Sequence, residues 1–143
     1  MCPSKATAFL KNVFARSKNG RGSETSVSLH MEMEQRRRTL IVRLKGELDH
    51  HTADTVKTRM EEAILRGNVN HVVLNMKDLT FMDSSGLGVI LGRYKQLSAL
   101  GGKMVVCDVN PAVYRLFELS GLFKILKFEE NERLALSSLE VVS

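Results

Sequence analysis

The sequence predicts an α/β domain with a mixed, mostly parallel sheet of about five strands that opens with a hairpin, and about four helices mainly against one face. Apolar runs of strand length alternate with stretches of helical periodicity, the order that produces parallel strands joined by helical crossovers. Only polar residues separate the first two apolar runs, which is typical of a hairpin. At 143 residues and 43% hydrophobic content, the chain suits one domain with its own core.

The hairpin is expected over residues 27–44. Residues 27–33 alternate between apolar and polar side chains, and residues 39–44 form a second strand that ends in the polar segment 46–49. Between the two strands lies the basic run Arg36, Arg37 and Arg38. We interpret this run as the solvated turn of the hairpin.

Two amphipathic helices and a buried strand follow. Residues 52–66 repeat apolar side chains on one helical face, and Gly67 is expected to stop that helix. Residues 71–76 form a short apolar strand. The next helix is predicted from a cap at Asp83 to about residue 100, with a buried face made of Leu87, Ile90, Leu91, Tyr94 and Leu97.

The C-terminal part continues the alternation. Residues 103–107 form a fourth strand, and Asn110 followed by Pro111 has the form of an N-cap with proline at the first helical position. This short helix is expected to end at Gly121. We predict a last strand over residues 123–128 and a final helix over residues 131–139 that carries Leu134, Ala135 and Ser138.

The net charge of +5 is concentrated at the N-terminus. Residues 1–26 contain five basic residues and one acidic residue, so residues 27–143 are nearly neutral. We interpret residues 1–26 as a basic extension, disordered or produced by a start-site artefact, and residues 27–143 as the domain. A nearly neutral domain does not favour nucleic-acid binding.

Composition argues against several other classes. No apolar run approaches the roughly 18 residues that a membrane span needs. The cysteines, Cys2 and Cys107, are too few for a disulfide framework, which indicates a reducing, cytoplasmic compartment. Asp49, His50 and His51 are neighbours in the sequence and rarely reach one ion together, so no metal site is predicted.

Two serines stand at the start of the helix predicted after Asp83. Ser84 and Ser85 would lie among unpaired backbone N–H groups at the positive end of the helix dipole. Both features favour added negative charge, so a phosphoserine is compatible with this element. The alternative is that the serines are ordinary residues of the helix start.

Glycines crowd the same helix. Each of Gly86, Gly88 and Gly92 costs roughly 1 kcal/mol relative to alanine, which indicates a compensating use. One use is a low strip over which another protein approaches the backbone. The other is tight packing of the helix against the sheet, and the sequence leaves both open.

Catalytic motifs are lacking around the serines. No nucleophile elbow surrounds them, no P-loop lysine follows the glycines, and no zinc-binding H-E-x-x-H helix occurs. Nothing near Ser84 supplies a base. We therefore predict no catalytic residues, no cofactor and no enzymatic activity, and expect the hydroxyls to be substrates of another enzyme.

Three segments carry a resemblance to a known family. They are residues 46–53 (GELDHHTA), residues 79–93 (LTFMDSSGLGVILGR), and the pair formed by residues 101–102 (GG) and 119–122 (LSGL). Together they resemble the anti-sigma factor antagonists of the STAS domain family, especially those that oppose the anti-sigma F factor in endospore-forming bacteria. The resemblance covers residues 27–143 and implies a single STAS-like domain.

The resemblance implies a phosphorylation switch. In the family, the first serine of this motif, here Ser84, is phosphorylated by the anti-sigma factor, which is itself a serine kinase. The unphosphorylated antagonist binds the anti-sigma factor and releases the sigma factor, and a serine phosphatase resets the switch. The chain would then be a positive regulator of sporulation transcription.

The same resemblance implies a partner-binding surface around the motif. Its expected members are Glu47, Asp49, Asp83, Ser84, Ser85, Gly86, Gly88 and Arg93. For Asp49 and Asp83 the alternative is helix capping, Ser85 rivals Ser84 as phosphoacceptor, and Arg93 is either an ionic contact at the edge or solvated.

Two other function classes stay open. A helix N-terminus with glycines can hold a phosphate, so the alternative function is a nucleotide-binding protein or weak nucleotide hydrolase, although the usual lysine is missing. The other is a scaffold subunit of a stress-signalling assembly, which the lack of a long folded N-terminal region disfavours.

Overall fold

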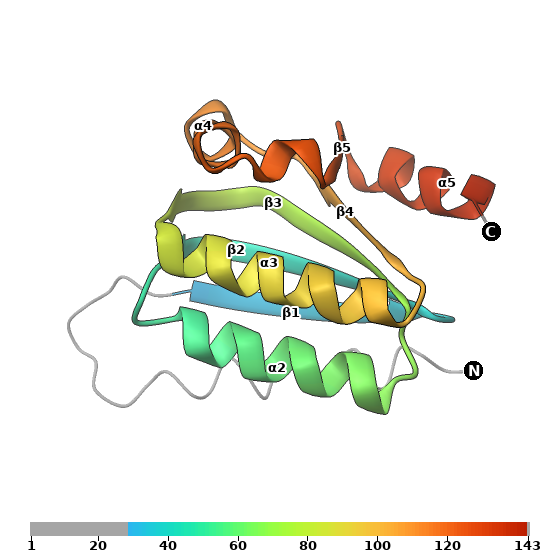
Figure 1. The fold of residues 1–143 in the computed structure, drawn as a ribbon. Coiled ribbons are helices and arrows are strands. Elements are labelled where there is room, and N and C mark those ends of the chain that lie inside the picture. The colour runs from blue at the N-terminus through green and yellow to red at the C-terminus, as the bar shows by residue number, and fades with distance from the viewer. Residues whose placement is uncertain (1–28, 143) are drawn as a thin grey trace.

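The computed structural model describes residues 29–142 (Figure 1). The predicted extension, residues 1–26, and the start of the domain at residue 27 lie outside this range. The strands are β1 (Leu29–Arg36), β2 (Thr39–Leu48), β3 (His71–Met82), β4 (Lys103–Cys107) and β5 (Lys127–Glu129). The helices are α2 (Ala53–Arg66), α3 (Ser84–Ala99), α4 (Pro111–Ser120) and α5 (Glu132–Val142), with a short 3₁₀ helix, η1 (Leu122–Lys124).

Within the described residues, one five-stranded sheet has its strands in chain order, β1 to β5. β1 pairs with β2 in antiparallel fashion, and the other neighbours are parallel. Arg36 pairs with Thr39, so Arg37 and Arg38 form the turn, with Arg37 at a φ of 56°. The predicted mixed sheet and opening hairpin are confirmed.

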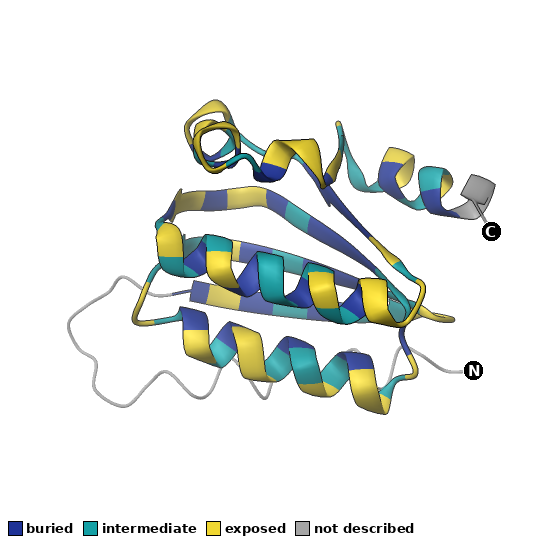
Figure 2. Ribbon diagram, viewed as in Figure 1, coloured by how far each residue is buried: buried dark blue, intermediate teal, exposed yellow. Residues whose placement is uncertain are grey.

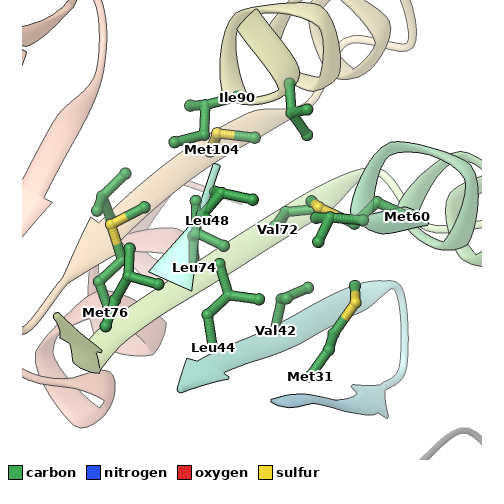
Figure 3. Close-up of a cluster of buried hydrophobic side chains, with 14 of the residues drawn as sticks. Met31, Val42, Leu44, Leu48, Met60, Val72, Leu74, Met76, Ile90 and Met104 are labelled. Atoms are coloured by element: carbon green, nitrogen blue, oxygen red, sulfur yellow. The ribbon is translucent and has the colours of Figure 1, made fainter. Parts of the chain in front are cut away.

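The helices lie on both faces of the sheet but mainly on one. Side chains of α2, α3 and α4 join the strands in the larger core, and side chains from β1 to β4, α2 and α3 point toward one another there (Figure 3). α5 covers the other face through Ala135 and Leu139, which pack against Ile41, Val73 and Val105. Buried residues accordingly alternate with exposed residues along α2 and along α3 (Figure 2).

Cys107 belongs to the smaller core beneath α5 and is a free cysteine. Burial, and then the nearby carboxylate of Asp108, raise the pKa of this thiol to about 12. The thiol is therefore protonated at neutral pH and unreactive.

Two strands extend further than the sequence pattern predicted. β3 has twelve residues and ends at Met82 rather than at residue 76, while β2 continues to Leu48 rather than ending at residue 44. The register shifts between Gly46 and Glu47, and Gly46 adopts a φ of 113°. Such an irregularity interrupts the alternation of side chains that marks a strand in sequence. The continuation of β2 past residue 44 was therefore not predicted.

The predicted strand over residues 123–128 is wrong for most of its length. Residues 122–124 form η1, and only Lys127–Glu129 is a strand. The N–H groups of Lys124 and Ile125 bond back to the carbonyls of Gly121 and Leu122. Leu122 and Leu126, spaced as in a helix, are the residues buried here.

Gly67 ends α2 as predicted, but not through a left-handed conformation. Its φ is −87°, and the left-handed residue is Asn68, with a φ of 55°. A Cβ at Gly67 would collide with the side chain of Gln35. The same Cβ would lie 2.9 Å from the carbonyl oxygen of Ala63, so a larger residue requires the end of the Gln35 side chain to move and the turn to adjust.

Candidate functional site

The predicted site residues gather where β2 and β3 end. Leu48 pairs with Met82, the last residues of the two strands, and the N–H of Asp83 donates to the carbonyl of Leu48 at 3.2 Å. Parallel strands present their carboxyl ends at one edge of the sheet. The turn after β2 and the start of α3 are therefore neighbours.

Asp83 caps α3, as predicted. Its backbone is extended, with a φ of −118°, and its Oδ1 accepts from the N–H of Ser85 at 2.8 Å. Ser84, the first helical residue, is exposed, and its hydroxyl makes no hydrogen bond to the described part of the chain. Ser85 is half-buried. Of the two hydroxyls, that of Ser84 is the more accessible.

Asp49 organises the turn that leads into α2. Its Oδ1 accepts from the N–H groups of His51 and Thr52, at 2.9 and 3.2 Å, and its carbonyl accepts from Ala53 N–H at 2.8 Å. The hydroxyl of Thr52 in turn donates to the carbonyl of Glu47 at 3.0 Å. Asp49 therefore stabilises the turn before α2 and is not its N-cap, which is Thr52. The residue is half-buried.

A long contact between polar side chains joins the two loops. His50 Nδ1 lies 3.9 Å from Asp83 Oδ2, and His50 is mostly exposed. Glu47 is half-buried and pairs with Phe81 across the strands. Asp49, Asp83, Ser84 and their neighbours thus form one acidic, solvent-facing edge.

Phe81 belongs to this edge and was missed. Its side chain is 46% exposed, although it precedes the buried Met82. The alternation of side chains along a strand contained the signal, since an inward Met82 requires an outward Phe81. An exposed aromatic side chain beside a candidate interface is a typical contact residue.

Gly86 has the second of the two uses that the sequence left open, tight packing of the helix against the sheet. It is buried, and a Cβ there would lie 2.6 Å from Cγ of Met82 and 2.9 Å from Cγ of Leu48. Close packing of α3 on the sheet explains this glycine. Gly88 and Gly92 differ, because nothing lies within 4 Å of a Cβ at either position.

Arg93 is not a solvated residue, which corrects that alternative of the prediction. It is 6% exposed, and its Nη2 donates to Oε2 of Glu61 on α2 at 3.2 Å. The predicted buried face of α3 is rotated accordingly: the buried residues are Gly86, Val89, Ile90, Arg93 and Leu97, while Leu87, Leu91 and Tyr94 are partly buried. The hydrophobic pattern missed this because a charged residue occupies an inward position.

A groove of about 370 Å³ runs between α2 and α3. Its α2 side includes Lys57 and Asp54, and its α3 side includes Ser85, Gly88 and Gly92. The groove therefore begins beside the serines and follows the helix pair away from them.

Residues 29–142 contain no group of three histidine, cysteine or acidic side chains that could hold a metal ion. Over the same residues, none of the helices combines the length and the apolar character that crossing a bilayer requires.

Comparison with known proteins places this geometry in a family. Residues 30–135 match the family model described as the STAS domain. The anti-sigma F factor antagonist of Paenibacillus polymyxa is 61% identical over 117 residues, which cover 82% of this chain and 100% of that protein. The anti-sigma F factor antagonist of Lysinibacillus sphaericus is 38% identical over 95 residues, covering 66% and 81% of the two chains.

Solved structures agree with the sequence relatives. The anti-sigma factor antagonist SpoIIAA in its unphosphorylated form superposes with a TM-score of 0.71 at 33% identity, covering 79% of this chain and 98% of that one. The Bacillus cell fate determinant SpoIIAA in the phosphorylated form gives a TM-score of 0.63 at 34% identity, covering 76% and 97%. The chain therefore belongs to the STAS domain family, among the anti-sigma factor antagonists.

Proposed function

We propose that this protein, unphosphorylated, binds an anti-sigma factor that is also a serine kinase, and so releases a sigma factor for sporulation transcription in the cytoplasm. Phosphorylation of Ser84 ends the association, and a serine phosphatase restores it. The observation that carries this proposal is the exposed Ser84 hydroxyl at the start of α3, free of hydrogen bonds to residues 29–142. The names of the relatives, and a relative solved in phosphorylated form, support it.

A phosphate at Ser84 would act on binding rather than on the fold. The hydroxyl makes no hydrogen bond within the described residues that its esterification would break. The helix N-terminus favours the added charge, whereas the carboxylates of Asp83 and Asp49 already make this edge acidic. Adding about 1.5–2 negative charges there disfavours a close protein contact by repulsion and desolvation.

The binding surface is proposed to comprise the acidic edge and the exposed start of α3. Its proposed members are Glu47, Asp49, Asp83, Ser84, Ser85 and Gly88, and we propose the exposed Phe81 as a further, apolar contact. Switching the population from mostly bound to mostly free requires several kcal/mol of differential affinity. Repulsion by a phosphate at this edge would contribute to that difference in affinity.

The protein itself is proposed to have no catalytic activity. No described side chain hydrogen-bonds to the Ser84 hydroxyl, so nothing in that part of the chain is positioned as its base. This arrangement supports a role for Ser84 as phosphoacceptor rather than nucleophile.

The test is to mix the purified protein with the anti-sigma F factor of Paenibacillus polymyxa and ATP, and to map the phosphopeptide by mass spectrometry. We expect phosphate on Ser84 in the wild type and in Ser85→Ala, and none in Ser84→Ala. Ser84→Ala should still bind the anti-sigma factor. Phosphate on Ser85, or a wild type that neither binds nor is phosphorylated, would contradict the proposal.

A further inference from the structure

Arg93 is the buried charged residue of the described chain, and most of its donors have no partner. It is 6% exposed, and only Nη2 is bonded, to Glu61. Nε and Nη1 are buried without a hydrogen-bond acceptor in residues 29–142. Unsatisfied donors on a buried cation are costly, so natural proteins rarely keep them without a use.

Arg93 lines the groove between α2 and α3, together with Lys57, Gly88 and Gly92. The two glycines are not required by packing, because a Cβ at either would meet nothing within 4 Å. Each nevertheless lowers helix stability by about 1 kcal/mol relative to alanine. They keep a shallow path open along α3, which leads from Ser85 to Arg93.

We propose that an acidic side chain of the anti-sigma factor enters this groove and pairs with Arg93. The inference rests on the proposed function and assigns a second contact to the same complex, about two and a half helical turns from Ser84 along α3. A carboxylate suits the donors, since guanidinium and carboxylate form paired hydrogen bonds. Lys57, which has no ion pair within residues 29–142, adds a second cation at the groove.

The entering carboxylate exchanges with Glu61. Glu61 holds Arg93 by a single 3.2 Å hydrogen bond, and its side chain is 41% exposed, so it can turn toward solvent. Asp54, also at the groove, opposes an incoming acid. The exchange is favourable because the partner satisfies donors that Glu61 leaves unpaired.

The first test compares affinities for the Paenibacillus polymyxa anti-sigma F factor by calorimetric titration. Arg93→Lys keeps the charge but removes the guanidinium donors, and should weaken binding about tenfold or more. Glu61→Gln removes the competing carboxylate and should tighten binding. Its matched control is Glu62→Gln, an exposed neighbour on α2 with the same change of charge.

A second variant, Gly92→Ala, tests the groove contact even if Arg93→Lys does not fold. Gly92→Ala fills the groove without a clash, so it should raise the melting temperature while weakening binding. Ser98→Ala, an exposed position on the same helix, should leave binding unchanged.

Wild-type affinity in both Arg93→Lys and Gly92→Ala would overturn the groove contact. Equal affinities of Glu61→Gln and Glu62→Gln would overturn the exchange on which the proposal depends. In both cases the wild type still binds and Ser84 is still phosphorylated, so the proposed function survives. A wild type that fails to bind would overturn both.

Discussion

Glycines in α3 serve opposite purposes within one turn. Gly86 faces the sheet, where Met82 and Leu48 leave no room for a methyl group, while Gly88 faces open space. Both cost helix stability in the same way. Only the environment of the missing Cβ distinguishes a packing glycine from a surface glycine.

Gly86→Ala and Gly88→Ala should therefore change stability in opposite directions. Gly86→Ala forces a methyl group against packed side chains and should lower the unfolding free energy by about 1–3 kcal/mol. Gly88→Ala should raise it by about 0.5–1 kcal/mol, since only helix propensity changes. Urea denaturation of the two variants gives both values. A shift in the same direction for both would show that Gly86 is not constrained by packing.

At the scale of elements, α5 is held on its face of the sheet by a half-buried polar anchor as well as by apolar contacts. Arg43 on β2 donates twice to the carboxylate of Glu132, at 2.6 and 3.0 Å, and Asn75 on β3 donates to it at 2.6 Å. The hydrogen bonds from Arg43, aided by Asn75, hold the pKa of Glu132 below its ordinary value despite burial. The anchor thus joins the start of α5 to two central strands.

Glu132→Gln should lower the unfolding free energy at pH 7 by about 1–3 kcal/mol, the worth of hydrogen bonds to a charged group. Because the folded pKa is depressed, this contribution is present above the unfolded pKa of about 4 and is lost as pH falls through the folded value. The wild type should therefore lose more stability than Glu132→Gln between pH 6 and pH 3. Urea midpoints across this range measure the difference.

The control for the anchor is Glu130→Gln. Glu130 is exposed and makes no hydrogen bond or ion pair within residues 29–142. This variant should match the wild type at pH 7 and follow the same acid dependence. An equal loss in the two variants would mean that general surface charge, and not the anchor, governs acid stability.

For the whole molecule, the acidic edge that carries Ser84 is separate from the cores. Ser84 lies at the surface beyond the strand ends, whereas the two hydrophobic cores occupy the two faces of the sheet. The fold resembles both the unphosphorylated and the phosphorylated forms of SpoIIAA. This separation is consistent with the proposed switch, in which binding changes with little change in structure.

Phosphorylation at Ser84 should leave the melting temperature within a few degrees of the unmodified protein, since charge at a helix N-terminus contributes only about 0.3–1 kcal/mol. Thermal unfolding of protein phosphorylated by the kinase, compared with the same sample after phosphatase treatment, provides the measurement. Loss of cooperative unfolding in the phosphorylated sample would contradict a switch that acts on binding alone.

Features that depend on local chemistry were predictable from the sequence. The cap at Asp83, the start of α4 at Asn110 and Pro111, its end at Gly121 and the hairpin all appear where expected. The side chains of Asp83 and Asn110 accept from backbone N–H groups of Ser85 and Val113, and Gly121 adopts a left-handed conformation. The same reasoning placed Ser84 and Ser85 at the entrance of a helix.

Tertiary structure decided which side chains face inward and how far the strands run. The shift at Gly46, the burial of Arg93 and the tight fit of Gly86 each depend on a neighbouring element that is distant in sequence. Residues 123–128 have strand composition, yet the burial of Leu122 and Leu126 leaves most of them outside the sheet. The sequence thus determined the order of the elements and the chemistry of their ends, whereas packing between elements determined burial, because burial depends on the facing surface.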